Sequence, residues 1–144
     1  MNAGDEGINA GNGLRIVRGR VDEYGTPLVP ITIVASDGFE LELEASINLR
    51  FSGFLVMPEP LAAAIGLRNL GARRVNVGTE TKVLSHFLGL VSFGGKHDSI
   101  SILGGYENKT IIGKRLLTGR RLTIDFFTGE VSIIPSEIES ARSS

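Results

Sequence analysis

The chain has 144 residues and a mass of 15.4 kDa, the size of one ordinary domain with enough residues to bury a core. Its net charge of -1 and pI near 6.1 show no basic excess, so nucleic acid and anionic membranes are not expected partners. The absence of cysteine excludes disulfides, thiolate catalysis and cysteine-ligated zinc.

The two ends of the chain differ in composition from its middle. Residues 1–14 are rich in Gly, Asn and Asp and resemble neither a signal peptide nor a membrane span, so we expect a flexible lead-in. Residues 136–144 carry little that packs, which predicts a frayed tail. Residues 15–135 between them form one predicted domain. The lack of cysteine leaves the compartment open, and a cytoplasmic location fits best.

An alternating pattern predicts strands along most of the domain. Apolar residues between 39 and 47 alternate with Glu40, Glu42 and Glu44, which is typical of a half-exposed strand with a solvated acidic face. Such alternate side chains fan out along one face without converging, so we do not interpret them as a metal site. Strands are predicted at residues 14–21, 28–34, 39–47, 75–77, 81–93, 99–103, 121–127 and 131–134, and residues 51–57 form a short apolar run with an internal glycine.

Helix signals are few. Pro58, Glu59 and Pro60 precede a run of helix-forming residues, and Gly66 follows it, which predicts a helix with a proline in its first turn and a glycine stop. A second short helix is predicted within residues 111–117. Many short strands with one or two short helices predict an all-β barrel or sandwich.

Two segments together resemble the signatures of a known family. Residues 45–58 read ASINLRFSGFLVMP and resemble the active-site segment of retropepsin-like aspartic peptidases, in which Asp-Thr-Gly leads into Phe-Ser-Gly-Phe-Leu and a Pro-capped helix. Asn48, Leu49 and Arg50 stand where that pattern has Asp, Thr and Gly. Residues 111–117 read IIGKRLL and resemble the second signature of the family, two apolar residues and a glycine before a short helix.

The resemblance covers roughly residues 19–135 and implies an all-β fold, a retropepsin-like closed β-barrel with one or two short helices and one lobe per chain. Because each motif occurs once, it also implies a two-fold homodimer that completes a single site. Residues 78–82 would form a flap over bound peptide. The implied substrate-binding positions are Ser52, Gly53, Thr79, Glu80, Thr81, Ile112 and Gly113.

The departures from the family pattern bear on catalysis. In that family two carboxylates share a proton, and the ionised one acts as general base. Asn48 neither releases nor takes up a proton at useful pH, so we expect little or no peptidase activity. Leu49 lacks the threonine hydroxyl, and Arg50 has a Cβ where glycine permits positive φ. We therefore predict an inactive homologue whose groove binds an extended peptide or protein tail.

Other functional interpretations stay open at this stage. An active endopeptidase would need Asp125, or a related partner chain that retains the aspartate; Asp125 is also explained as a structural hydrogen-bonding residue in the last hairpin. A purely structural dimerisation module with a closed groove is a second alternative. An unrelated small barrel is a third.

No metal or cofactor is predicted. His86 lies in an apolar strand, and His97 with Asp98 lacks a third spaced ligand. Gly113 and Lys114 form a Gly-Lys pair, but the upstream glycine and the following Ser or Thr of a phosphate-binding loop are missing.

Overall fold

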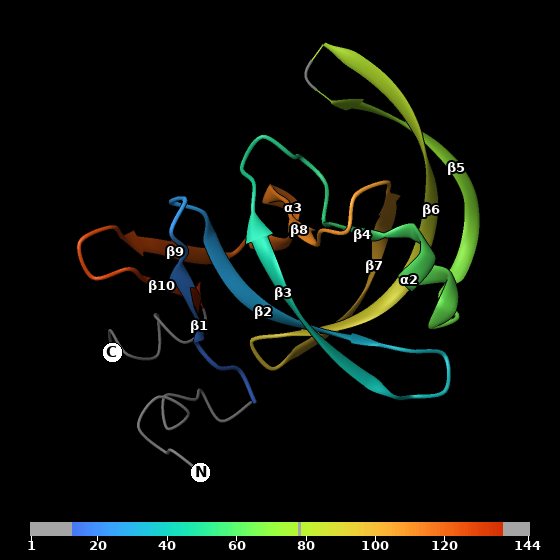
Figure 1. Cartoon of the computed structure of the whole chain (residues 1–144). Helices are drawn as coiled ribbons and strands as arrows, with labels where there is room; N and C mark the ends of the chain where they lie inside the picture. Colours follow the sequence, from blue (N-terminus) through green and yellow to red (C-terminus); the bar gives the residue numbers. More distant parts are fainter. Residues whose placement is uncertain (1–12, 78, 137–144) are drawn as a thin grey trace.

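The computed structural model describes residues 13–77 and 79–136, which fold mainly into strands (Figure 1). The strands are β1 (Val17–Val21), β2 (Pro27–Val34), β3 (Glu40–Ile47), β4 (Leu55–Pro58), β5 (Arg68–Val77), β6 (Glu80–Phe93), β7 (Lys96–Gly105), β8 (Ile111–Ile112), β9 (Arg120–Asp125) and β10 (Glu130–Pro135). The helices are α2 (Glu59–Ala64) and α3 (Lys114–Leu117).

Strand β2 closes the sheet into a barrel. The strand order is β5-β6-β7-β4-β8-β3-β2-β1-β10-β9, with an additional pairing of β6 with β2. One edge of β2 pairs with β3, while its other edge pairs first with β1, at Pro27 and Leu28, and then with β6, from Thr32 to Val34. The ring is therefore β2, β3, β8, β4, β7 and β6. The long β5–β6 hairpin and the β1–β10–β9 sheet extend from it (Figure 1).

The alternating pattern of the sequence matches the two faces of the barrel wall. Ile31 and Ile33 of β2 are 1% and 0% exposed and lie in the core, while Glu40, Glu42 and Glu44 of β3 are exposed. The predicted solvated acidic face is thus confirmed. Burying branched apolar residues in this way contributes about 1.5–3 kcal/mol each to folding.

Helix α2 forms where the proline and glycine signals predict it. Pro58 is the N-cap residue, Glu59 lies in the first turn, and the backbone N–H of Gly66 donates to the carbonyl of Ala63. Gly66 has a φ of +76°, a conformation that favours glycine, and a Cβ there would lie 2.3 Å from Ser36 Oγ. The helix prediction is confirmed.

Two local predictions are corrected. Ile111 and Ile112 form strand β8 rather than the start of a helix, because they pair with β3 on one side and β4 on the other. Within the apolar run 51–57, strand β4 begins at Leu55, and residues 48–54 form the loop before it. Strand β5 begins at Arg68, seven residues before the predicted strand at 75–77.

The predicted ends fall largely outside the described residues. Of the lead-in, Gly13 and Leu14 are described, and Leu14 is buried. Of the tail, Ser136 is described, and its backbone N–H donates to the carbonyl of Gly119 at 2.9 Å. Within residues 13–77 and 79–136, neither helix has the length and apolar character that crossing a bilayer requires.

Candidate functional site

The loop between β3 and β4 carries Asn48, Leu49 and Arg50, all exposed. Asn48 Oδ1 accepts the backbone N–H of Arg50 at 3.0 Å, and the Asn48 carbonyl accepts the N–H of Phe51 at 3.1 Å. The side chain thus closes its own turn, as Asn commonly does. No described non-glycine residue has a positive φ, so the backbone at Arg50 does not need the glycine conformation that the family pattern implies.

This loop is joined to the segment around Gly113 through main-chain hydrogen bonds. The two segments are about sixty residues apart in the sequence, and each carries one of the two family-like motifs. Because backbone groups make these bonds, they require no particular side-chain donor or acceptor. The bonds run from Asn48 N to Ile112 O (3.0 Å), Gly113 N to Phe54 O (3.0 Å), Lys114 N to Phe51 O (2.9 Å) and Arg115 N to Gly53 O (3.1 Å).

Gly113 permits this close approach. A Cβ at position 113 would lie 2.2 Å from the carbonyl oxygen of Gly53 and 2.5 Å from a ring carbon of Phe51. The first contact is with backbone, which cannot rotate away as a side chain can. Glycine at 113 is therefore a steric requirement of the joined loops.

Two adjoining cavities, each of about 450 Å³, lie beside the loop. They share Arg50, Phe51, Val75, Asn76 and Leu103, so they form one groove between the loop and the β5–β6 hairpin; we call it the Asn48 groove. Its further lining residues are Asn48, Val56, Lys82, Leu84, Gly105, Tyr106, Glu107, Lys109 and Ile111 on one side and Ser52, Gly53, Phe54, Arg73, Arg74, Ser101 and Arg115 on the other.

The predicted substrate-binding positions are only partly in this groove. Ser52 and Gly53 line it beside Arg50. Ile112 is 0% exposed and belongs to the core, and Gly113 is also buried; the neighbouring Ile111 lines the groove instead. Leu49 is 53% exposed and lies outside both cavity linings.

The predicted flap residues lie at the tip of the β5–β6 hairpin. Thr79, Glu80 and Thr81 are exposed there, outside the lining of the groove, and Gly78 is outside the described residues. Thr81 Oγ1 donates to Asn76 Oδ1 at 3.2 Å, which ties the two strands together near the tip. The hairpin residues that do line the groove lie further from the tip: Arg73, Arg74, Val75, Asn76, Lys82 and Leu84.

The charge of the groove could not be foreseen from the separate motifs. Four arginines, Arg50, Arg73, Arg74 and Arg115, line one half, and Lys82 and Lys109 line the other. The groove contains one carboxylate, Glu107, which lies 3.7 Å from Lys109, and no aspartate lines either cavity. These cations come from elements and loops that are far apart in the sequence, so no local sequence pattern predicts that they line one groove.

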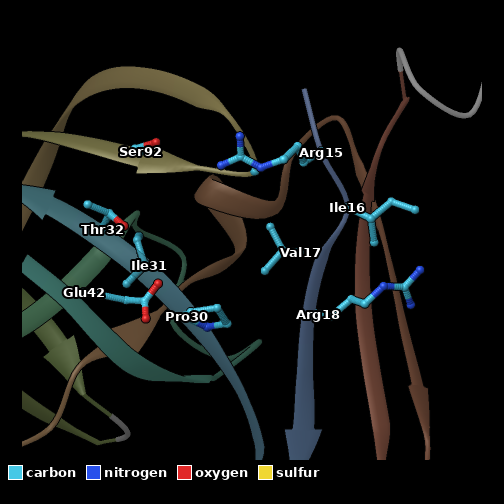
Figure 2. A pocket seen from close by; sticks show the side chains of 10 residues that line it. Arg15, Ile16, Val17, Arg18, Pro30, Ile31, Thr32, Glu42 and Ser92 are labelled. Atoms are coloured by element: carbon cyan, nitrogen blue, oxygen red, sulfur yellow. The ribbon is translucent and has the colours of Figure 1, made fainter. Parts of the chain in front are cut away.

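A separate cavity of about 340 Å³ lies where β2 passes from β1 to β6 (Figure 2). On that edge of β2, residues 29–31 have no strand partner in the described structure, and the gap is lined by Pro30 and Ile31. Arg18 points away from Glu42 across the gap in Figure 2. We interpret this cavity as a gap that forms where β2 changes its pairing partner, and not as a binding site.

The remaining candidate residues have structural partners. His86 Nε2 lies 2.5 Å from Ser101 Oγ, and the same oxygen accepts a hydrogen bond from Arg73 Nη1 at 3.2 Å. Asp98 lies 4.0 Å from Lys96. Residues 13–77 and 79–136 contain no group of three His, Asp or Glu side chains suited to a metal ion.

Asp125 caps the β9–β10 turn. Its Oδ1 accepts the backbone N–H groups of Phe127, at 2.9 Å, and Thr128, at 3.1 Å. The bond from Thr128, followed by that from Phe127, holds the pKa of the Asp125 carboxyl below its ordinary value, because both favour the charged form. Asp125 does not line the Asn48 groove.

Comparison with known proteins supports the fold. No protein-family model and no curated protein matches the chain. Among solved structures, it is similar to a retropepsin-like aspartic protease from Rickettsia conorii, with a TM-score of 0.60 and 12% identity over 85% of this chain and 92% of that one. The simian foamy virus protease aligns at a TM-score of 0.44 and 10% identity, over 61% and 90% of the two chains. The chain has the single-lobe retropepsin-like fold, as predicted.

Substituting Gly113→Ala tests the joined loops. The added Cβ overlaps the Gly53 carbonyl, so we expect a loss of about 1–3 kcal/mol in the free energy of unfolding, measured by urea denaturation. Lys114→Ala at the next, exposed position is the control and should change stability by less than about 0.5 kcal/mol. Equal stability of the two variants would show that residues 53 and 113 do not approach this closely.

Substituting Asp125→Ala tests the turn cap. The lowered pKa means that the ionised carboxylate stabilises the fold above its pKa in the unfolded chain, and that this contribution disappears as pH falls through the folded pKa. The variant should therefore melt below the unmodified protein at pH 7, with the difference shrinking as the pH is lowered toward about 2. Asp37→Ala, in another turn, gives a comparison. A difference in melting temperature that grows in acid would contradict the assignment.

Proposed function

We propose that this chain is a retropepsin-like lobe that binds extended peptides without cleaving them. In this proposal Asn48, Leu49 and Arg50 occupy the positions of the family's Asp-Thr-Gly. The support is the sequence of the loop together with the fold, since the β3–β4 loop opens onto the groove under the β5–β6 hairpin.

The observation that carries the proposal is the absence of a usable acid in the Asn48 groove as described. Neither cavity is lined by an aspartate, and the one glutamate, Glu107, lies 3.7 Å from Lys109. An amide at position 48 cannot transfer a proton, and general acid–base catalysis alone is worth about 10²–10⁴-fold in rate. The groove keeps the space for a peptide and lacks the proton transfer that hydrolysis requires.

We also propose that two chains pair about a two-fold axis near Asn48. A single lobe offers one half of the groove, and a closed two-fold pair would complete it. Arg50 is exposed in this loop, and its guanidinium has no acidic partner within the described part of the chain. Two Arg50 guanidinium groups near a two-fold axis repel each other unless each binds an anion. The pairing of two chains therefore depends on whether the groove holds an anionic ligand.

The proposal is tested by incubating the full-length protein with a mixed peptide pool between about pH 3.5 and 7. We expect some peptides to be retained by the protein and all of them to stay intact by mass spectrometry, because binding requires the groove and cleavage requires a proton-transfer pair. Pepstatin-sensitive cleavage by the unmodified protein would contradict the proposal. Its loss in Asp125→Asn would then identify Asp125 as the acid.

The triple variant Asn48→Asp, Leu49→Thr, Arg50→Gly tests the same site by restoring the family pattern. In the proposed dimer it places two aspartates at position 48 that can share a proton, and it removes the charge of Arg50. We therefore expect cleavage, at acid pH, of peptides that the unmodified chain only binds. Asn76→Asp is the control, since it adds a carboxylate elsewhere in the groove without the pairing at position 48. Cleavage by the control to the same extent would contradict the assignment of position 48.

A further inference from the structure

We infer that the ligand of the Asn48 groove is an acidic peptide, bound in extended form along strand β5 with its carboxylates facing arginines. This rests on the proposed function, because it names the class of peptide that the same groove takes. It goes further in assigning Arg73 and Arg74 as specificity-determining residues.

The charge of the groove favours an acidic ligand. Six cations line the groove against one carboxylate, in a chain whose net charge is -1. Of these cations, Lys109 lies within 4 Å of a carboxylate; Arg73 instead bonds Ser101, and Arg115 lies 5.1 Å from the centre of the Phe54 ring. A concave surface that gathers one sign of charge attracts ligands of the opposite sign.

The outer edge of β5 favours an extended peptide. This strand is last in the sheet order, so its outer edge pairs with no strand in the described structure. Residues 73–76 are consecutive, yet all four line the same cavity. Because neighbouring side chains of a strand point to opposite faces, four lining residues in a row fit a cavity that reaches the edge of the strand. Unpaired N–H and C=O groups on such an edge accept an added peptide strand.

The walls of the groove favour a peptide over other polyanions. Leu84, Leu103 and Val56 give the groove apolar walls that suit the alternate side chains of a peptide. A nucleic acid has no main-chain pattern that matches a strand edge. An acidic peptide can pair with the strand edge, place side chains against the apolar walls and complement the positive charge of the groove.

The experiment measures binding of short end-blocked peptides by fluorescence anisotropy to the full-length protein. The peptides share a Val- and Thr-rich sequence and differ only in carrying Glu, Gln or Lys at the same alternate positions. We expect the Glu peptide to bind about 10-fold more tightly than the Gln peptide at low salt, and the Lys peptide most weakly. The preference should shrink at about 0.5 M salt, which screens exposed charges.

Variants then locate the preference. Arg73→Gln/Arg74→Gln should weaken the Glu peptide by about 3- to 10-fold and leave the Gln peptide nearly unchanged, since each exposed charge contributes modestly. Arg20→Gln/Lys96→Gln removes the same charge at exposed positions outside both the groove and strand β5, and should leave the order of affinities intact. Melting temperatures of both double variants check that they fold.

Each other outcome is decisive. Equal binding of Glu and Gln peptides overturns this inference and leaves the proposed function standing. Failure of all peptides to bind overturns both. A single-stranded oligonucleotide that binds as tightly as the Glu peptide and displaces it overturns the peptide assignment in favour of nucleic acid. Equal losses in the two double variants would show that net charge, rather than the groove, attracts the ligand.

Discussion

The main-chain bonds between the β3–β4 loop and the start of α3 are the constraint on which the site depends. They set Asn48 N–H against the Ile112 carbonyl and bring Gly113 against Phe54 and Gly53, at a distance that no side chain at 113 allows. Since β8 also pairs with both β3 and β4, the loop leaves one barrel strand and returns to another with little freedom. These main-chain bonds explain how the loop can carry an unusual sequence and still keep its path.

The same main-chain bonds fix the path of the loop independently of the chemistry of its side chains. Asn48 holds the turn through its own side chain, bonding the Arg50 N–H at 3.0 Å, and a negative φ at Arg50 makes glycine unnecessary. In our proposal this loop positions no carboxylate, so it can carry a cation instead. Arg50 then adds to the arginines that β5 and α3 bring to the same groove, and in our proposal the site changes from one suited to proton transfer to one suited to binding anions.

The predictable parts of the structure are those in which local pattern and tertiary contact agree. The acidic face of β3 and the proline-to-glycine limits of α2 follow from period and capping alone. Residues 68–74 of β5 escape sequence-based prediction, because an edge strand exposed on both faces shows no alternation. The two-residue strand β8 is mistaken for part of a helix because only its neighbours define it. The cationic groove escapes prediction for a related reason: Arg50, Arg74 and Arg115 meet only after folding, and the net charge of -1 conceals them.

We propose, centrally, that two Asn48 loops face one another across a groove that binds peptides and does not cut them. The most direct test is an isotope-filtered NOE experiment on a dimer mixed from labelled and unlabelled chains. We predict contacts between the Asn48 side-chain amide of one chain and residues of the β3–β4 loop of its partner. A monomeric chain, or a dimer whose contacts lie elsewhere and leave Asn48 in solvent, would contradict this account.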